Sequence, residues 1–177
     1  MHYNVAQLLK EPTGSTRRHT VDEGSLLLDE VTVDRLEGSL LLTRTDLGVW
    51  VNGSLRAETA ATCSRCLEEF NQSLGLDLDD QYYPPVDPDS GDPIADALME
   101  DDSFRVSPAQ VLDVGEAVRQ HVLARTPMKL LCRPDCAGIC PQCGANRNVT
   151  LCLCTERHDD PRWARLHQIL ASAEPRS

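Results

Sequence analysis

Alternation of apolar and polar residues dominates the first half of the chain and predicts antiparallel β-structure. Apolar residues occupy every second position over much of Val49–Ala61 and again over Phe70–Tyr82. A period of two places one set of side chains on each face of a strand, so both stretches are predicted to be half-buried strands. Leu26–Val33 and Leu36–Leu42 are rich in Leu and Val and are also predicted to be strands. The expected interruptions of these strands are Gly24, Gly38, Asp46–Gly48 and Asn52–Gly53.

Helical periodicity appears in three shorter stretches. Residues 5–9 form one apolar helical face at the start of the chain. Residues 113–116 have the spacing of a capping box, and the apolar positions that follow predict a helix that runs to about Ala124 and packs on the sheet. Asp160 followed by Pro161 predicts the start of a short terminal helix, with Trp163 packed beneath it.

The composition changes along the chain and predicts two regions. Residues 1–126 are expected to form a β-rich core domain with a long exposed acidic loop at 84–108. Residues 127–177 are expected to form a cysteine-rich zinc module with a C-terminal helix. The predicted fold class is therefore α+β. It combines an antiparallel sheet or partial barrel, one packed helix, and a zinc-bound C-terminal module ending in a short helix.

Eight cysteines are the most informative chemical feature of the sequence. The N-terminus lacks a basic leader followed by an apolar run, and no segment approaches the roughly 20 apolar residues that cross a bilayer. We therefore expect a cytoplasmic protein without membrane attachment. Structural disulfides are rare in that compartment, so metal binding or redox chemistry is the better explanation of the cysteines. Six of the eight lie within residues 132–154, which favours metal ligation over incidental burial.

The cysteine spacing predicts two structural zinc ions, each held by four thiolates in a tetrahedron. The simplest assignment forms one site from Cys140, Cys143, Cys152 and Cys154 and a second from Cys63, Cys66, Cys132 and Cys136. The second site would fasten a hairpin tip to the chain that leaves the helix. Gly144 would allow a positive φ just after the second sulfur of its CxxC. A rival assignment groups Cys132, Cys136, Cys140 and Cys143 and leaves the other two pairs elsewhere or free of metal.

The charge is divided unevenly, which bears on any contact with nucleic acid. The net charge of −11 excludes a protein that coats nucleic acid with its whole surface. Residues 1–124 carry 9 Lys+Arg and 23 Asp+Glu, or −14, whereas residues 125–177 carry 8 and 5, or +3. Four thiolates around a zinc ion add about −2 per site, which reduces that surplus. The candidate RNA contacts are Lys129, Arg133, Arg147, Arg157, Arg162 and Arg165.

Five segments, taken in order, resemble one protein family. They are residues 4–17, the Cys63–Leu67 motif with Phe70, residues 113–114 with 127–132, residues 135–146, and Asp160–Trp163 with Leu166. Together they resemble the YceD family of bacterial and plastid proteins, named for large ribosomal RNA subunit accumulation. The resemblance implies a factor that supports 23S rRNA accumulation and large ribosomal subunit assembly. Its implied partner is the precursor large subunit, through rRNA or a ribosomal protein.

Two other function classes stay open beside an assembly factor. One is a zinc-stabilised protein-interaction module unrelated to ribosomes, and the other is a thiol redox sensor or enzyme. Neither CxxC opens a convincing helix, which disfavours redox catalysis. The sequence has no glycine-rich phosphate loop, no HExxH and no GxSxG, so we expect no enzymatic activity and no small-molecule substrate.

Overall fold

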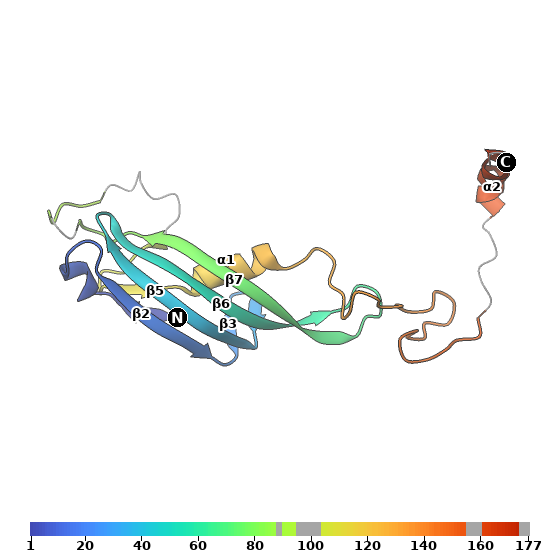
Figure 1. Ribbon diagram of the computed structural model, residues 1–177, viewed down its shortest axis with the longest axis horizontal. Helices are drawn as coiled ribbons and strands as arrows, with labels where there is room; N and C mark the ends of the chain where they lie inside the picture. Colours follow the sequence, from blue (N-terminus) through green and yellow to red (C-terminus); the bar gives the residue numbers. More distant parts are fainter. Residues whose placement is uncertain (88–89, 95–103, 155–160, 174–177) are drawn as a thin grey trace.

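A four-stranded antiparallel sheet forms the main body of the molecule, and the C-terminal part of the chain extends from one end of it (Figure 1). The computed structural model describes the whole chain except residues 88–89, 95–103, 155–160 and 174–177. The sheet has the order β2-β5-β6-β7, and its strands are β2 (Thr16–Glu23), β5 (Arg35–Thr45), β6 (Gly48–Thr62) and β7 (Glu69–Tyr82). The prediction of a mainly antiparallel sheet is confirmed. Within the described residues this sheet is open, with β2 and β7 as its edges, and does not close into a partial barrel.

Two small sheets and a few short helices complete the fold. Strand β1 (His2–Asn4) pairs with β8 (Val111–Asp113), and β3 (Leu26–Leu28) pairs with β4 (Val31–Val33). The helices are η1 (Leu8–Lys10), α1 (Gly115–Arg125), η4 (Pro161–Trp163) and α2 (Ala164–Ala173). None of the helices in the described part of the chain is long and apolar enough to cross a bilayer.

One hydrophobic core packs between a face of the sheet and helix α1. Most of the inward positions that the alternation predicted are buried, and these are Val49, Val51, Leu55 and Ala57 of β6 and Leu74, Leu76, Leu78 and Tyr82 of β7. Towards the hairpin tip, Thr59, Ala61 and Phe70 are only partly buried. Helix α1 buries Ala117, Val118 and Val122 in the same cluster, and the N-terminal segment adds Val5 and Leu8. Because aromatic residues are scarce, aliphatic side chains supply nearly all of this apolar burial, which is the main stabilising contribution to the fold.

Two glycines that were predicted to interrupt strands lie within β5 and β6 instead. A Cβ on Gly38 would lie 2.3 Å from the carbonyl oxygen of Ser54, and a Cβ on Gly53 would lie 2.3 Å from that of Ser39. Gly38 also has a φ of 148°, which other residues rarely adopt. These glycines therefore allow the two strands to approach closely, which is a common role of glycine inside a sheet.

Other predictions about the strands need correction. The predicted strand Leu26–Val33 is a hairpin of β3 and β4, because the chain turns at Asp29, whose φ is 50°. Strand β2 was not predicted at all. It is an edge strand with Val21 as its buried residue, so its sequence shows almost no apolar alternation.

The predicted acidic loop is also not exposed throughout. Val106, near its end, is 2% exposed and donates its backbone N–H to the carbonyl of Tyr83 at 2.9 Å. The side chain of Phe104 contacts the ring of Tyr82 edge to face, at a centroid distance of 5.4 Å. The last residues of the loop therefore pack on the core. Residues 88–89 and 95–103 of the predicted loop lie outside the described part of the chain.

Helix α1 follows the predicted path but begins differently. Its N-cap is Val114, which makes no side-chain capping bond, and the Asp113 carboxylate accepts the backbone N–H of Gly115 at 2.9 Å. Glu116 bonds Arg119 instead of reaching back to the cap. The predicted capping box is therefore not formed. Near the C-terminus, Trp163 is 57% exposed and does not pack in the core, and Asp160 lies outside the described residues.

Strands β6 and β7 extend beyond the rest of the sheet as a two-stranded hairpin (Figure 1). Strand β5 pairs with β6 only up to Glu58, whereas Thr59–Thr62 pairs only with Glu69–Gln72 of β7. The chain that leaves α1 returns to the tip of this hairpin, where the backbone N–H of Ser64 donates to the carbonyl of Leu130 at 2.8 Å. We call residues 59–72 and 127–154 together the cysteine arm.

Candidate metal centre

The eight cysteine sulfurs gather into two groups in the cysteine arm. The hairpin cysteine group consists of Cys63, Cys66, Cys132 and Cys136, and the loop cysteine group consists of Cys140, Cys143, Cys152 and Cys154. Within each group all four Sγ atoms lie within 4.8 Å of one another. Each group could hold one metal ion. This grouping agrees with the simplest assignment from the sequence and differs from the rival one.

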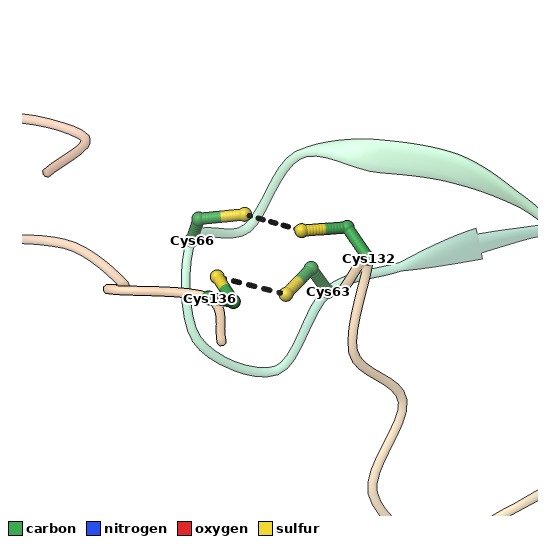
Figure 2. Close-up of side chains that lie close together, drawn as sticks. All are labelled: Cys63, Cys66, Cys132 and Cys136. Atoms are coloured by element: carbon green, nitrogen blue, oxygen red, sulfur yellow. Dashed lines mark hydrogen bonds between the residues drawn. The ribbon is translucent and has the colours of Figure 1, made fainter. Parts of the chain in front are cut away.

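The hairpin cysteine group has the dimensions of a four-sulfur metal site. Figure 2 shows its four side chains converging, two from the hairpin tip and two from the chain after α1. The Sγ atoms of Cys63 and Cys136 are 3.7 Å apart, and so are those of Cys66 and Cys132. A tetrahedron with zinc–sulfur bonds of about 2.3 Å has sulfur–sulfur edges of about 3.8 Å. The two distances match such a site, and all four cysteines are free thiols.

The two CxxC motifs fold into the same tight turn. The backbone N–H of Leu67 donates to the carbonyl of Cys63 at 2.9 Å, and that of Gly144 donates to the carbonyl of Cys140 at 2.9 Å. The residue after each second cysteine has a positive φ, 61° at Leu67 and 71° at Gly144. The positive φ predicted at Gly144 is confirmed. In both motifs the turn brings two sulfurs to one side of the backbone.

Backbone and side-chain contacts hold the returning chain against the hairpin tip. The Arg65 guanidinium donates to the carbonyl of Cys136 at 2.9 Å, and the backbone N–H of Ile139 donates to the carbonyl of Arg65 at 3.0 Å. Phe70 and Leu131 pack against the cysteines of the hairpin group. The four cysteines of this group therefore lie where the β6–β7 hairpin meets the chain that follows α1. The zinc ion expected at this junction stays a prediction.

Backbone hydrogen bonds and burial shift the pKa values of the thiols in opposite directions. Backbone N–H groups of Cys132 and Cys66 lower the pKa of Cys63 to about 6, and those of Cys143 and Gln142 lower that of Cys140 to about 6. Burial, reinforced by the thiol of Cys66, raises the pKa of Cys132 to about 12. Four close thiols cannot all ionise without a cation, whereas a bound divalent metal deprotonates its thiol ligands.

The two groups differ in their access to solvent. In the hairpin group Cys63, Cys66 and Cys136 are at most 4% exposed and Cys132 is exposed, whereas in the loop group Cys140 is buried and Cys143 and Cys154 are exposed. The hairpin group is therefore the better protected of the two against solvent.

Most of the candidate RNA contacts lie on the surface. Lys129, Arg147, Arg162 and Arg165 are exposed, and Arg157 lies outside the described residues. Arg133 has a structural role, because it donates to the Oδ1 of Asn148 at 2.7 Å and lies 3.6 Å from the Asp135 carboxylate. Lys129 and Arg147 make no side-chain hydrogen bond or ion pair within the part of the chain that is described.

Two asparagines in the loop after Gly144 were not identified from the sequence as part of the site. The amide of Asn148 donates to the Sγ of Cys136 at 3.3 Å, and the amide of Asn146 donates to Glu68 on the hairpin at 3.3 Å. Asn is common in turns because its side chain bonds nearby backbone. The sequence offered one signal for their role, since both asparagines lie between the Cys140–Cys143 pair and the Cys152–Cys154 pair.

Comparison with known proteins agrees with this geometry and identifies the family. The chain is 29% identical over 180 residues to uncharacterized proteins of Mycobacterium bovis and Mycobacterium tuberculosis, covering 96% of this chain and 81% of theirs. An uncharacterized protein of Mycobacterium leprae is 27% identical over 131 residues, which is 73% of this chain and 56% of that one. No solved structure matches the chain. Residues 51–170, which contain all eight cysteines, match the family described as Large ribosomal RNA subunit accumulation protein YceD, and the chain belongs to that family.

Proposed function

We propose that this protein is a non-catalytic cytoplasmic factor that supports 23S rRNA accumulation and assembly of the large ribosomal subunit. Membership of the YceD family is the observation that carries the proposal. The direct test is depletion of the protein in its own cell, followed by measurement of precursor and mature large-subunit rRNA. The proposal expects mature 23S rRNA to fall relative to 16S rRNA. Unchanged rRNA levels and subunit ratios would contradict it.

We propose further that zinc fills both cysteine groups and has a structural role. Four thiolates favour zinc over harder divalent ions, and a site with four protein ligands leaves no open position for catalysis. The sulfur spacing of 3.7 Å in the hairpin group supports this choice. Metal analysis of protein purified without chelator should give about two zinc ions per chain, as two complete four-thiolate sites require. A zinc content near zero under reducing conditions would rule out zinc. If the protein instead contained iron and absorbed visible light, iron would be the metal of these groups.

The cysteine arm is the proposed contact with the precursor particle. Lys129 and Arg147 project from it, and their lack of described side-chain partners leaves their charge available to phosphate. Because the arm is folded around its cysteine groups, these side chains would lose less entropy on binding than they would in a flexible tail. The sheet, by contrast, belongs to the part of the chain with a net charge of 9 − 23 = −14 over residues 1–124.

A pair of charge-matched variants tests this contact. Lys129→Gln with Arg147→Gln should weaken co-sedimentation with large-subunit precursors and lower the salt dependence of binding, by about one unit of log–log slope per lost phosphate contact. The control is Arg18→Gln with Arg56→Gln, which removes the same charge from exposed positions on the sheet. Equal binding by both variants would contradict an RNA contact through the arm. Loss of binding in the control alone would move the contact to the sheet.

A further inference from the structure

The side chain of Asn148 contacts the hairpin cysteine group. It belongs to the loop 144–151, which joins the two cysteine pairs of the loop group. Its amide nitrogen nevertheless donates to the Sγ of Cys136, a member of the hairpin group, at 3.3 Å. Its amide oxygen accepts the backbone N–H of Ala137 at 2.8 Å. A residue carried by one group therefore bonds a sulfur of the other.

The position of Asn148 depends on how the loop is folded. The oxygen of Asn146 accepts both the backbone N–H and the side-chain amide of Asn148, each at 2.9 Å. The backbone N–H of Cys140 donates to Ala145 at 2.8 Å, and that of Arg147 donates to Gly138 at 2.8 Å. A metal ion bound by the loop group would tie the two ends of this loop together. That link reduces the entropy lost when the loop orders.

A hydrogen bond to a ligand sulfur stabilises the thiolate that binds a metal. Partners of this kind, outside the ligand set, typically change metal affinity by about 10- to 100-fold. The Sγ of Cys136 is largely shielded from water, since the residue is 2% exposed. The amide of Asn148 therefore supplies a donor that solvent cannot easily replace.

We propose that the two cysteine groups bind metal cooperatively and that Asn148 is the positioning residue that couples them. Metal in the loop group orders the loop, and the ordered loop presents the Asn148 amide to Cys136. Metal affinity of the hairpin group then rises about tenfold, the lower end of the range for such partners. By linkage, metal in the hairpin group raises the affinity of the loop group by the same factor. This inference rests on the metal binding in the proposed function and not on the role in ribosome assembly.

Four full-length chains test the coupling. They are the wild type, Asn148→Asp, the double variant Cys143→Ser with Cys154→Ser, and the combination of all three substitutions. Aspartate keeps an acceptor for the N–H of Ala137 but has no N–H to donate to sulfur. The readout is the ¹¹³Cd resonance of the hairpin group, identified by its survival in the double cysteine variant. Its intensity in competition with a chelator gives the affinity of that group alone.

The expected result is a non-additive cycle. Asn148→Asp should lower the affinity of the hairpin group about tenfold when the loop group is intact, and much less when it is disabled. The double variant Cys143→Ser with Cys154→Ser, which keeps Asn148, should lower the metal affinity of the hairpin group by a similar factor. Asn71→Asp is the control for added charge, because Asn71 is exposed on the same hairpin. It should leave the affinity unchanged.

Other outcomes overturn the proposal. An equal loss from Asn148→Asp in both backgrounds would make Asn148 a local partner of Cys136 without coupling. Unchanged affinity of the hairpin group after loss of the loop group would also exclude cooperativity. In the reverse variant, Cys63→Ser with Cys66→Ser, the metal affinity of the loop group must fall by the same factor. Misfolding caused by the loop substitutions cannot produce this fall, because the reverse variant keeps all four cysteines of the loop group. If the wild type binds no metal at either group, the metal part of the proposed function fails instead.

Discussion

The β-sheet and the cysteine arm are two parts of one chain that are held together by different forces. In the sheet, one continuous cluster of buried aliphatic side chains spans the strands, helix α1 and the N-terminal segment. In the arm, the described apolar residues that pack around the buried cysteines are Phe70 and Leu131. Val149, Leu151 and Leu153 of the arm are 82%, 95% and 99% exposed. A segment that buries so little apolar surface requires cross-links to hold one conformation.

The same contrast appears in the backbone. In the sheet, long ladders pair the backbone groups of β5, β6 and β7. Between residues 127 and 154, the described chain has one isolated bridge, between Ile139 and Asn146, and otherwise turns and irregular structure. We therefore expect the sheet to form from the polypeptide alone and the structure of the arm to depend on metal bound by its thiols. Four predictions test this contrast, from the largest expected effect to the smallest.

Removal of metal should separate the two regions most clearly. Structural zinc contributes about 10 kcal/mol or more to the folding of small metal-dependent modules. After chelation under reducing conditions, backbone amides of residues 127–154 should lose their protection from hydrogen exchange, while those of β5 and β6 keep theirs. Adding zinc back should restore the protection. Unchanged protection in the arm, or loss of protection in the sheet as well, would contradict the contrast.

Truncation of a core side chain should destabilise the sheet and leave the metal groups intact. Leu76 is 0% exposed, so Leu76→Ala should lower the free energy of unfolding of the sheet by about 4 kcal/mol, through lost burial and a residual cavity. Leu27 is 74% exposed, and Leu27→Ala should change it by less than about 0.5 kcal/mol. Denaturant unfolding followed through the tryptophans measures both. Metal content should equal that of the wild type below the transition.

A methyl group at Gly38 should destabilise the sheet somewhat less. Its Cβ would lie 2.3 Å from the Ser54 carbonyl, so Gly38→Ala forces β5 and β6 apart and should lower the free energy of unfolding by about 3 kcal/mol. Gly75 in β7 has open space around the same position, and Gly75→Ala is the matched control. The control should be neutral or slightly stabilising. Equal effects of the two substitutions would show that the close approach of the strands is unimportant.

The smallest effect is expected at the turns after the two CxxC motifs. Gly144→Ala places a side chain at a φ of 71°, which should cost about 1 kcal/mol and lower metal affinity of the loop group about fivefold. Leu67 already has a side chain at a φ of 61°, so Leu67→Gly should change affinity of the hairpin group little, because relief of strain offsets the added flexibility. Chelator competition measures both. A larger loss of metal affinity from Leu67→Gly than from Gly144→Ala would show that the two turns are not equivalent.

Prediction from the sequence succeeded where a residue pattern has one structural meaning. The alternation in β6 and β7 placed the buried side chains of both strands, and it placed Cys63 and Cys66 at the turn between them. Prediction failed at β2, whose single buried residue Val21 leaves no pattern to read. It also failed at Gly38, because glycine marks both a strand end and a close approach between strands.

The sequence by itself determined which side chains of the arm are candidate metal ligands, because eight thiols and the spacing of two CxxC turns limit the ligand type and the number of candidate sites. It left two assignments of the cysteines open. Only the tertiary structure shows which sulfurs lie close together, since Cys63 and Cys136 are 73 residues apart and meet through the length of the β6–β7 hairpin and the path of the chain after α1. The contact between Asn148 and Cys136 arises in the same way. Such contacts depend on the path that tertiary packing gives to the backbone, and a local pattern of residues does not predict that path.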